Sequence, residues 1–179
     1  MDRESVEITS RAQWREWLTT NHANSSGIWL VYFKKGAAEA VPYEELVLEA
    51  LCFGWVDSQA RGVDERRTSI TMTPRRPVSR WTQPNRDRVE TLEAAGLMTS
   101  AGRAVIAQAK SLGTWDELRP VENLELPDDL AQALAGRLHQ WEALSRSARF
   151  QHLLALHDAK RPETRSRKIT AILDSLNAT

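Results

Sequence analysis

Hydrophobic residues recur with a helical period over most of the chain, and this period is lost in one central stretch. Near the N-terminus, Trp14, Trp17 and Leu18 lie three and four positions apart, so they share one face of a predicted helix. Ser10, with Gln13 three residues later, has the form of a capping box that would begin this helix. Two tryptophans one turn apart are typical of core anchors rather than ligand contacts.

A short hydrophobic run without a helical period follows. Ile28–Phe33 is a continuous β-branched and aromatic run, which predicts a strand that is at least partly covered on both faces. A second helix is predicted around Pro42, a residue suited to a first helical turn. Gly54 is expected to end that helix as the residue after its C-cap.

From residue 55 the pattern changes to short alternating pieces. Val56 and the residues after it predict one strand, and Thr68–Thr73 predicts a second. Residues 62–65 would join them as a hairpin loop. The two prolines within residues 74–77 cannot continue a central strand, so the second strand is expected to end there.

The remaining residues return to helical patterns. One helix is predicted from Thr82, an N-cap residue, to Gly96, and another from Thr99 to Gly113. Beyond them, Pro162 would interrupt a series of amphipathic segments. The chain as a whole is therefore predicted to be mainly helical outside the central stretch.

These patterns predict the α+β class: a small, mainly antiparallel sheet covered by helices, followed by an all-helical C-terminal region. We divide the chain into an α+β domain at residues 1–113, an ordered linker at residues 114–127, and a C-terminal helical region at residues 128–179. The linker contains proline and isolated apolar residues, which would pack against the rest of the protein.

Composition and charge exclude several classes of protein. The 179 residues contain 24 basic and 24 acidic side chains, so there is no general preference for nucleic acid or an anionic membrane. No apolar run approaches the roughly 20 residues of a membrane span, and the first ten residues lack the apolar core of a signal peptide. We therefore expect a cytoplasmic protein. The single cysteine, Cys52, excludes an internal disulfide, and its apolar neighbours predict a buried thiol.

Local charge is concentrated in the central segment, which we define as residues 54–85. Between residues 59 and 88 there are eight arginines and three acidic residues, a net charge of +5 in a chain of net charge zero. Arginine suits bidentate contacts with carboxylate or phosphate and stacking on aromatic rings. The alternative is that these arginines pair with acidic residues such as Glu44 and keep the surface soluble.

The central segment is therefore the candidate binding surface. Its arginines and serine at positions 75–80 could form an anion site with the N-terminus of the helix that follows. The candidate ligand-binding residues are Trp55, Asp57, Ser58, Arg61, Arg75, Arg76, Ser79, Arg80, Trp81 and Asn85. The expected partner is an anionic small molecule or an acidic protein surface, and no cofactor is expected.

Asp57 is the candidate for chemistry in this segment. It could act as a base or orienting carboxylate, or it could hold an arginine such as Arg61. No histidine lies between His22 and His139, and no nucleophile, zinc or phosphate-loop motif is present. A structural pairing is therefore favoured, and no catalytic residue is assigned unless Asp57 has that role.

The histidines of the C-terminal half do not predict a metal site. His139, His152 and His157 are separated by thirteen and five residues, so neighbouring pairs do not share a helical face. No cysteine or cluster of carboxylates would complete a coordination shell. We expect no bound metal.

The same residues resemble a known family. The run ALCFGWVDS at residues 50–58 and the run TPRRP at residues 73–77, together with residues 14–18, 28–30 and 159–165, are similar to the YdeI/OmpD-associated family of bacteriocin-protection proteins. The similarity extends over nearly the whole chain. It implies resistance to bacteriocins or antimicrobial peptides and an association with an outer-membrane protein, and it brings no set of catalytic residues.

Three functions are compatible with these observations. The first is a cytoplasmic, non-enzymatic binding or stress-protection protein that uses the central segment to bind an anion. The second is an enzyme acting on a small anionic substrate, with Asp57 and an arginine clamp. The third is a nucleic-acid-binding protein that uses the central segment, a second basic patch around Pro162 and exposed tryptophan.

Overall fold

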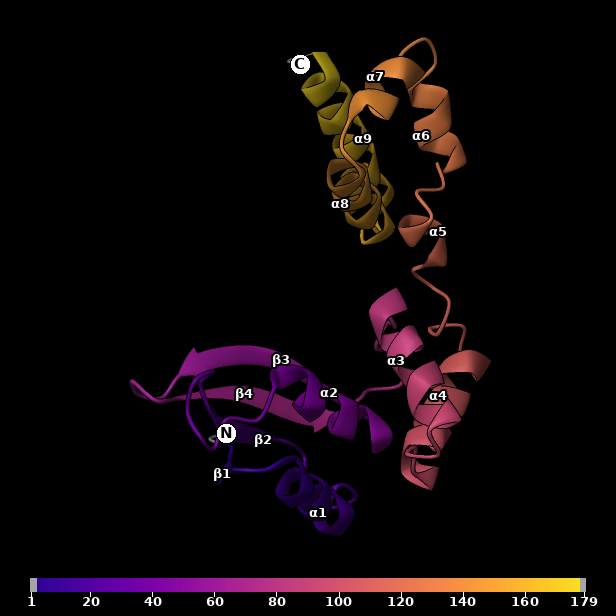
Figure 1. The fold of residues 1–179 in the computed structure, drawn as a ribbon. Helices are drawn as coiled ribbons and strands as arrows, with labels where there is room; N and C mark the ends of the chain where they lie inside the picture. The colour runs from indigo at the N-terminus through magenta and orange to yellow at the C-terminus, as the bar shows by residue number, and fades with distance from the viewer. Residues whose placement is uncertain (1–2, 178–179) are drawn as a thin grey trace. The chain divides into compact units, whose positions relative to one another are not determined.

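The protein consists of two compact units. The computed structural model describes residues 3–177, and the chain divides between Asp116 and Glu117. Figure 1 shows the elements of both units along the chain, from β1 to α9.

The first unit is built on a four-stranded mixed sheet. Its strands are β1 (Ser5–Glu7), β2 (Ile28–Phe33), β3 (Trp55–Gly62) and β4 (Arg67–Pro74), in the spatial order β1-β2-β4-β3. β1 runs parallel to β2, whereas β4 pairs antiparallel with β2 and with β3. The predicted small, mainly antiparallel sheet is confirmed.

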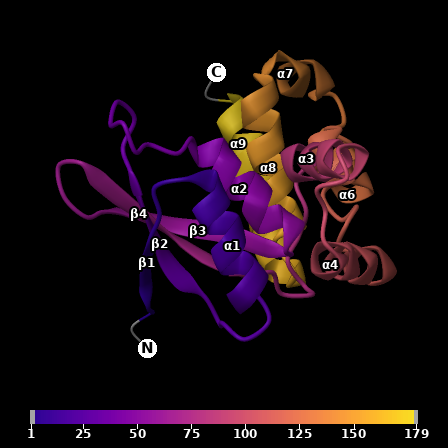
Figure 2. The ribbon, with the colours of Figure 1, turned by 60° about the horizontal axis from the view of Figure 1, so that its bottom comes forward.

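Helices cover one face of this sheet. The first unit contains α1 (Arg11–Asn21), α2 (Tyr43–Cys52), α3 (Gln83–Ala94) and α4 (Ser100–Ser111). Figure 2 shows α1 and α2 lying in front of the strands. Strand residues such as Leu30 and Met72 share one buried core with Trp14 and Leu18 of α1 and Leu46 of α2. The hydrophobic effect therefore fixes which face of the sheet is covered.

The signals at Ser10 and Gly54 act as predicted, whereas the Thr82 side chain makes no capping hydrogen bond at the start of α3. The Ser10 side chain accepts a hydrogen bond from the Gln13 backbone N–H at 3.2 Å, and the Gln13 side chain accepts one from the Thr9 N–H at 2.8 Å. Gly54 follows α2 with a φ of 74°. Such left-handed backbone favours glycine, which explains why α2 ends there.

α4 packs closely against the C-terminal end of α2. The Thr99 hydroxyl donates to the Cys52 carbonyl at 2.6 Å, and the Thr99 backbone N–H donates to the same oxygen at 3.2 Å. A Cβ atom added at Gly102 would lie 2.3 Å from that carbonyl oxygen. Only a residue without a side chain allows this approach. The Cys52 thiol is buried and forms no disulfide, as predicted.

The second unit is all-helical, as predicted. It contains α5 (Arg119–Glu122), α6 (Asp128–Ala133), α7 (Leu138–Ala143), α8 (Arg146–His157) and α9 (Pro162–Asn177). It has its own core, to which α5 to α9 contribute Val121, Leu130, Trp141, Leu153 and Ile172. The stretch expected as a linker thus contains a short helix whose Val121 belongs to this core.

The N-terminal strand was not predicted from the sequence. β1 has three residues, and only Val6 among them is apolar, so the stretch carries no strand period. It is held by its pairing with β2, and the Trp29 N–H donates to the Glu4 carbonyl at 2.8 Å. Among residues 3–177, no helix has both the length and the apolar character needed to cross a membrane.

Candidate functional site

The predicted site residues are divided between the two faces of β3. Side chains alternate along a strand, so Trp55 and Asp57 point to one face while Val56 and Ser58 point to the other. Trp55 and Asp57 contact side chains of α1 and α2. Val56 and Ser58 instead line a pocket on the opposite face. The predicted residues therefore do not converge on one pocket.

Trp55 belongs to the core. Its side chain is 1% exposed and lies edge-on to Trp14 and Trp17 of α1, with ring centroids 6.5 and 5.6 Å away. Its indole N–H donates to the His22 carbonyl at 3.3 Å. Burial of this size stabilises the fold and leaves no surface for a ligand.

Asp57 accepts a hydrogen bond from a tyrosine. The Tyr43 hydroxyl on α2 donates to Asp57 Oδ2 at 2.5 Å. Burial raises the pKa of Tyr43, and the hydrogen bond and negative charge of Asp57 raise that pKa further. The carboxylate thus stabilises the neutral phenol. The predicted pairing of Asp57 with Arg61 is not formed; the Arg61 guanidinium lies 3.8 Å from the Trp29 ring centroid instead.

Arg75 is buried beneath the loop that follows β4. Its side chain is 7% exposed, and its guanidinium carbon lies 3.9 Å from the ring centroid of Trp81, which is itself buried. Arg75 Nη1 donates to the Arg80 carbonyl at 2.9 Å. Burial lowers the pKa of Arg75 to about 10, against the opposing effect of the Asp57 charge. These contacts give Arg75 and Trp81 a structural role.

The start of α3 is occupied by its own side chains. Asn85 Oδ1 accepts from Arg88 Nη1 at 2.8 Å, and Arg88 makes a bidentate pair with Glu44 of α2, with both N–O distances 2.7 Å. The buried Arg86 donates to the carbonyls of Trp81 and Trp115. The alternative that these arginines pair internally therefore holds at this end of the segment. Arg80 is exposed and does not line the pocket on the open face.

That pocket, which we call the arginine pocket, has a volume of about 430 Å³. It is lined by the basic residues Arg3 and Arg76, the hydroxyl residues Ser26, Ser58, Thr73 and Ser79, and the apolar Val56 and Pro74. No described lining residue is acidic. Cations and hydroxyl donors without a carboxylate are the groups that bind an anion.

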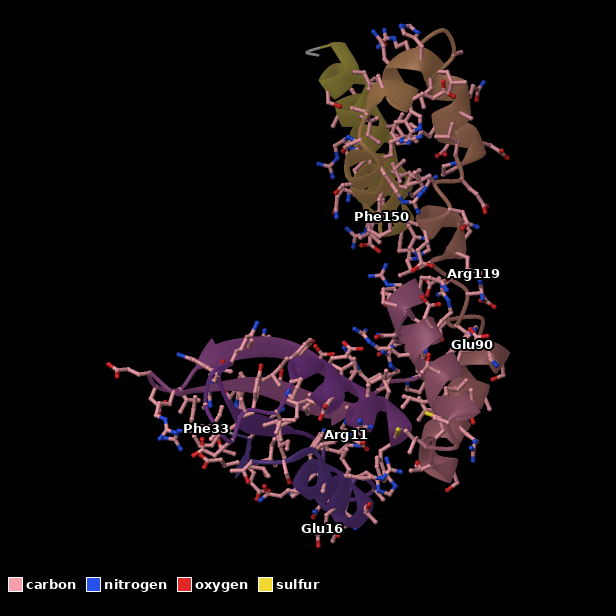
Figure 3. All side chains as sticks on the ribbon, in the orientation of Figure 1. Arg11, Glu16, Phe33, Glu90, Arg119 and Phe150 are labelled. Atoms are coloured by element: carbon pink, nitrogen blue, oxygen red, sulfur yellow. The ribbon has the colours of Figure 1, made fainter. Side chains whose placement is uncertain are left out.

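The arginines of the pocket differ from most others in the first unit. Arg11, which is labelled in Figure 3, and Arg15 both contact the buried Glu49 at 2.6 Å. Arg3 and Arg76, by contrast, are exposed, and neither forms an ion pair with any residue in the described range 3–177. No carboxylate among the described residues neutralises these two charges.

The sequence predicted three residues of this pocket and missed others. Ser58, Arg76 and Ser79 were predicted, whereas Arg3 and Ser26 were not. Ser26 comes close because the next residue, Gly27, has a φ of 128°, and a Cβ there would lie 2.6 Å from the Thr73 side chain. The glycine after Ser26 was the available sequence signal.

Among the described residues, no group of three or more His, Cys, Asp or Glu side chains could hold a metal ion.

In comparisons with known protein families, the two units match different family models. Residues 6–105 match the family model described as Domain of unknown function (DUF8412). The chain belongs to this family. In this DUF8412 protein, residues 123–178 also match the model Bacteriocin-protection, YdeI or OmpD-Associated. That match confirms the resemblance, but only for the C-terminal part; the runs at residues 50–58 and 73–77 lie within the DUF8412 match.

No curated protein and no solved structure matches the DUF8412 chain.

Proposed function

We propose that the protein binds a small anionic ligand in the arginine pocket, as a binding protein rather than an enzyme. The observation that carries the proposal is the pairing of Arg3 and Arg76, both free of ion pairs to described residues, with four hydroxyl side chains and no carboxylate. A phosphate or carboxylate would replace the water on both guanidinium groups and accept hydrogen bonds from the hydroxyls of Ser26, Thr73 and Ser79. The Ser58 hydroxyl is already hydrogen-bonded to the Thr71 hydroxyl at 2.6 Å.

The alternative functions find less support. Asp57 lies on the opposite face of β3 from the pocket and is occupied by Tyr43, which favours a structural role over catalysis. For nucleic acid, the aromatic faces on the sheet are already covered, since Arg61 stacks on Trp29 and Arg66 on Phe33. Stacking of bases needs such faces free.

The family description bears on the kind of ligand. The family model that matches residues 123–178 carries bacteriocin protection in its description. A cationic peptide would be repelled by Arg3 and Arg76, so the pocket suits an anionic metabolite or an acidic protein surface. We propose that any protective role runs through such a ligand in the cytoplasm.

The test is a calorimetric titration of the full chain with inorganic phosphate and with succinate. Arg76→Gln should weaken binding about tenfold or more, because a hydrogen bond to a charged group contributes roughly 1.5–3 kcal/mol. The exposed position of Arg76 means that the variant should melt at the wild-type temperature.

Arg167→Gln is the matched control. Arg167 is an exposed arginine of α9 in the second unit, and it lies outside the pocket. Its loss should leave both affinities unchanged. Equal binding by wild type and Arg76→Gln, or an equal loss in the two variants, would show that the pocket is not the binding site.

A further inference from the structure

A second hollow continues the arginine pocket along the same unit. It has a volume of about 800 Å³ and shares Arg3 and Ser26 with the arginine pocket. The two hollows are therefore adjacent around these shared residues, and we call them together the groove, with Arg76 lining one part and Trp17 the other. We call the second part the Trp17 hollow. Its volume is within the range of sites that hold small molecules and cofactors.

Trp17 gives this hollow a fixed aromatic surface. Its ring stacks on Trp14 with centroids 5.4 Å apart and planes 20° from parallel, and Trp55 meets it edge-on at 82°. Trp14 and Trp55 are buried, whereas Trp17 is half-buried and lines the hollow. A rigid indole of this kind stacks on a planar ring with little loss of conformational entropy.

The polar groups around Trp17 differ from those of the arginine pocket. Asn21 donates one N–H to the Trp17 carbonyl at 2.8 Å, which leaves its Oδ1 as an acceptor. Asn24 offers an exposed amide with both donors and an acceptor, and Glu4 adds a carboxylate that can accept from hydroxyl groups. This end of the groove thus suits a neutral ring that carries hydroxyls and ring nitrogens.

The two ends of the groove therefore differ in chemistry. The Arg76 end presents cations, and the Trp17 end presents an aromatic ring, amides and a carboxylate. We propose that it binds a nucleotide, with the phosphate in the arginine pocket and the base against Trp17. Glu4, which also lines the Trp17 hollow, would accept from ribose hydroxyls, and Asn21 and Asn24 would contact the edge of the base. This inference rests on the proposed anion site and names the class of its ligand.

The experiment compares AMP, ribose 5-phosphate, adenosine and inorganic phosphate by calorimetry on the full chain. AMP should bind about tenfold or more tightly than ribose 5-phosphate, because the base adds a stacking contact. Trp17→Leu should remove this difference and leave the affinity for ribose 5-phosphate unchanged. Arg76→Gln should weaken AMP and ribose 5-phosphate equally.

Trp17 also packs against Trp14, so its variant could lose stability. Asn24→Ala is therefore a second variant, at an exposed position, and it should weaken AMP severalfold without affecting ribose 5-phosphate. Gln108→Ala, which removes an exposed amide from α4 outside the groove, is its control and should leave AMP binding unchanged.

The outcomes separate the two proposals. If AMP binds no more tightly than ribose 5-phosphate while Arg76→Gln weakens both, the nucleotide inference is overturned and the anion site stands. If adenosine binds as tightly as AMP and Arg76→Gln has no effect, the anion site is overturned. Absence of binding by AMP, ribose 5-phosphate and inorganic phosphate overturns both.

Discussion

Arg75 and Arg76 are adjacent in sequence and have opposite environments. Arg75 is buried against the ring of Trp81 and donates to a backbone carbonyl, whereas Arg76 is exposed and lines the arginine pocket. One backbone step separates a structural cation from one that is available to a ligand. At the scale of the residue, the predicted anion site thus combines a buried arginine of the core, Arg75, with an exposed one, Arg76.

This difference predicts different effects on stability. Arg75→Ala should lower the free energy of unfolding by about 2 kcal/mol, because it removes a desolvated cation–π contact with Trp81 and a hydrogen bond to the Arg80 carbonyl. Arg76→Ala should change it by less than about 0.5 kcal/mol, as is usual for exposed positions. Urea denaturation followed by tryptophan fluorescence measures both. Similar losses in the two variants would contradict these roles.

The sequence identified the arginine-rich segment but did not separate its members. Which arginine is buried depends on the position of Trp81, six residues after Arg75, and on the turn between them. Arg3 was missed for another reason: it reaches the pocket through the pairing of β1 with β2, a contact that no local pattern encodes. Local signals predict elements better than they predict which side chains meet.

At the scale of the element, the contact between α2 and α4 is so close that it leaves no room for a side chain at Gly102. Gly102 is the third residue of α4, and glycine within a helix lowers its stability, yet here it allows the helix to approach the Cys52 carbonyl. The packing of two helices therefore overrides a local preference.

We predict that Gly102→Ala is destabilising despite the better helix propensity of alanine. The propensity gain is at most about 1 kcal/mol, but a Cβ 2.3 Å from a backbone oxygen forces the helices apart, and such overpacking costs about 1–3 kcal/mol. Thermal and urea unfolding should show a net loss.

Gly62→Ala is the control for this prediction. A Cβ at Gly62, at the end of β3, would meet no atom within 4 Å, so this substitution should leave stability unchanged or slightly raised. A Gly102→Ala variant as stable as the wild type would show that α4 moves away freely.

Element prediction succeeded where periodicity and caps agree. The run Ile28–Phe33 is β2 to the residue, and Gly54 ends α2, since both follow from local chemistry. β1 was missed because its stability comes from pairing with β2 rather than from its own three residues.

At the scale of the whole molecule, the chain contains two units with separate cores. The α+β class was predictable because strand patterns are confined to the first half and helical patterns continue to the end. The groove was not predictable, since its residues come from segments far apart in sequence, from Arg3 to Ser79.

This division predicts that a fragment of residues 1–116 folds alone and retains the anion site. The fragment contains the core of the first unit and every described residue that lines the arginine pocket. Circular dichroism should show a cooperative melt, and calorimetry should give the full chain's affinity for inorganic phosphate. A fragment that folds without binding phosphate would contradict the assignment of the pocket to this unit.

The burial of Cys52 has a practical consequence. It is the only cysteine of the chain, it is fully buried, and burial raises the pKa of its thiol. A thiol reagent can therefore modify it only when the first unit opens around α2, since the buried thiol must become accessible and lose its proton to react. The rate of labelling at Cys52 therefore reports how often the first unit opens. It can be measured in the wild-type protein with and without ligand.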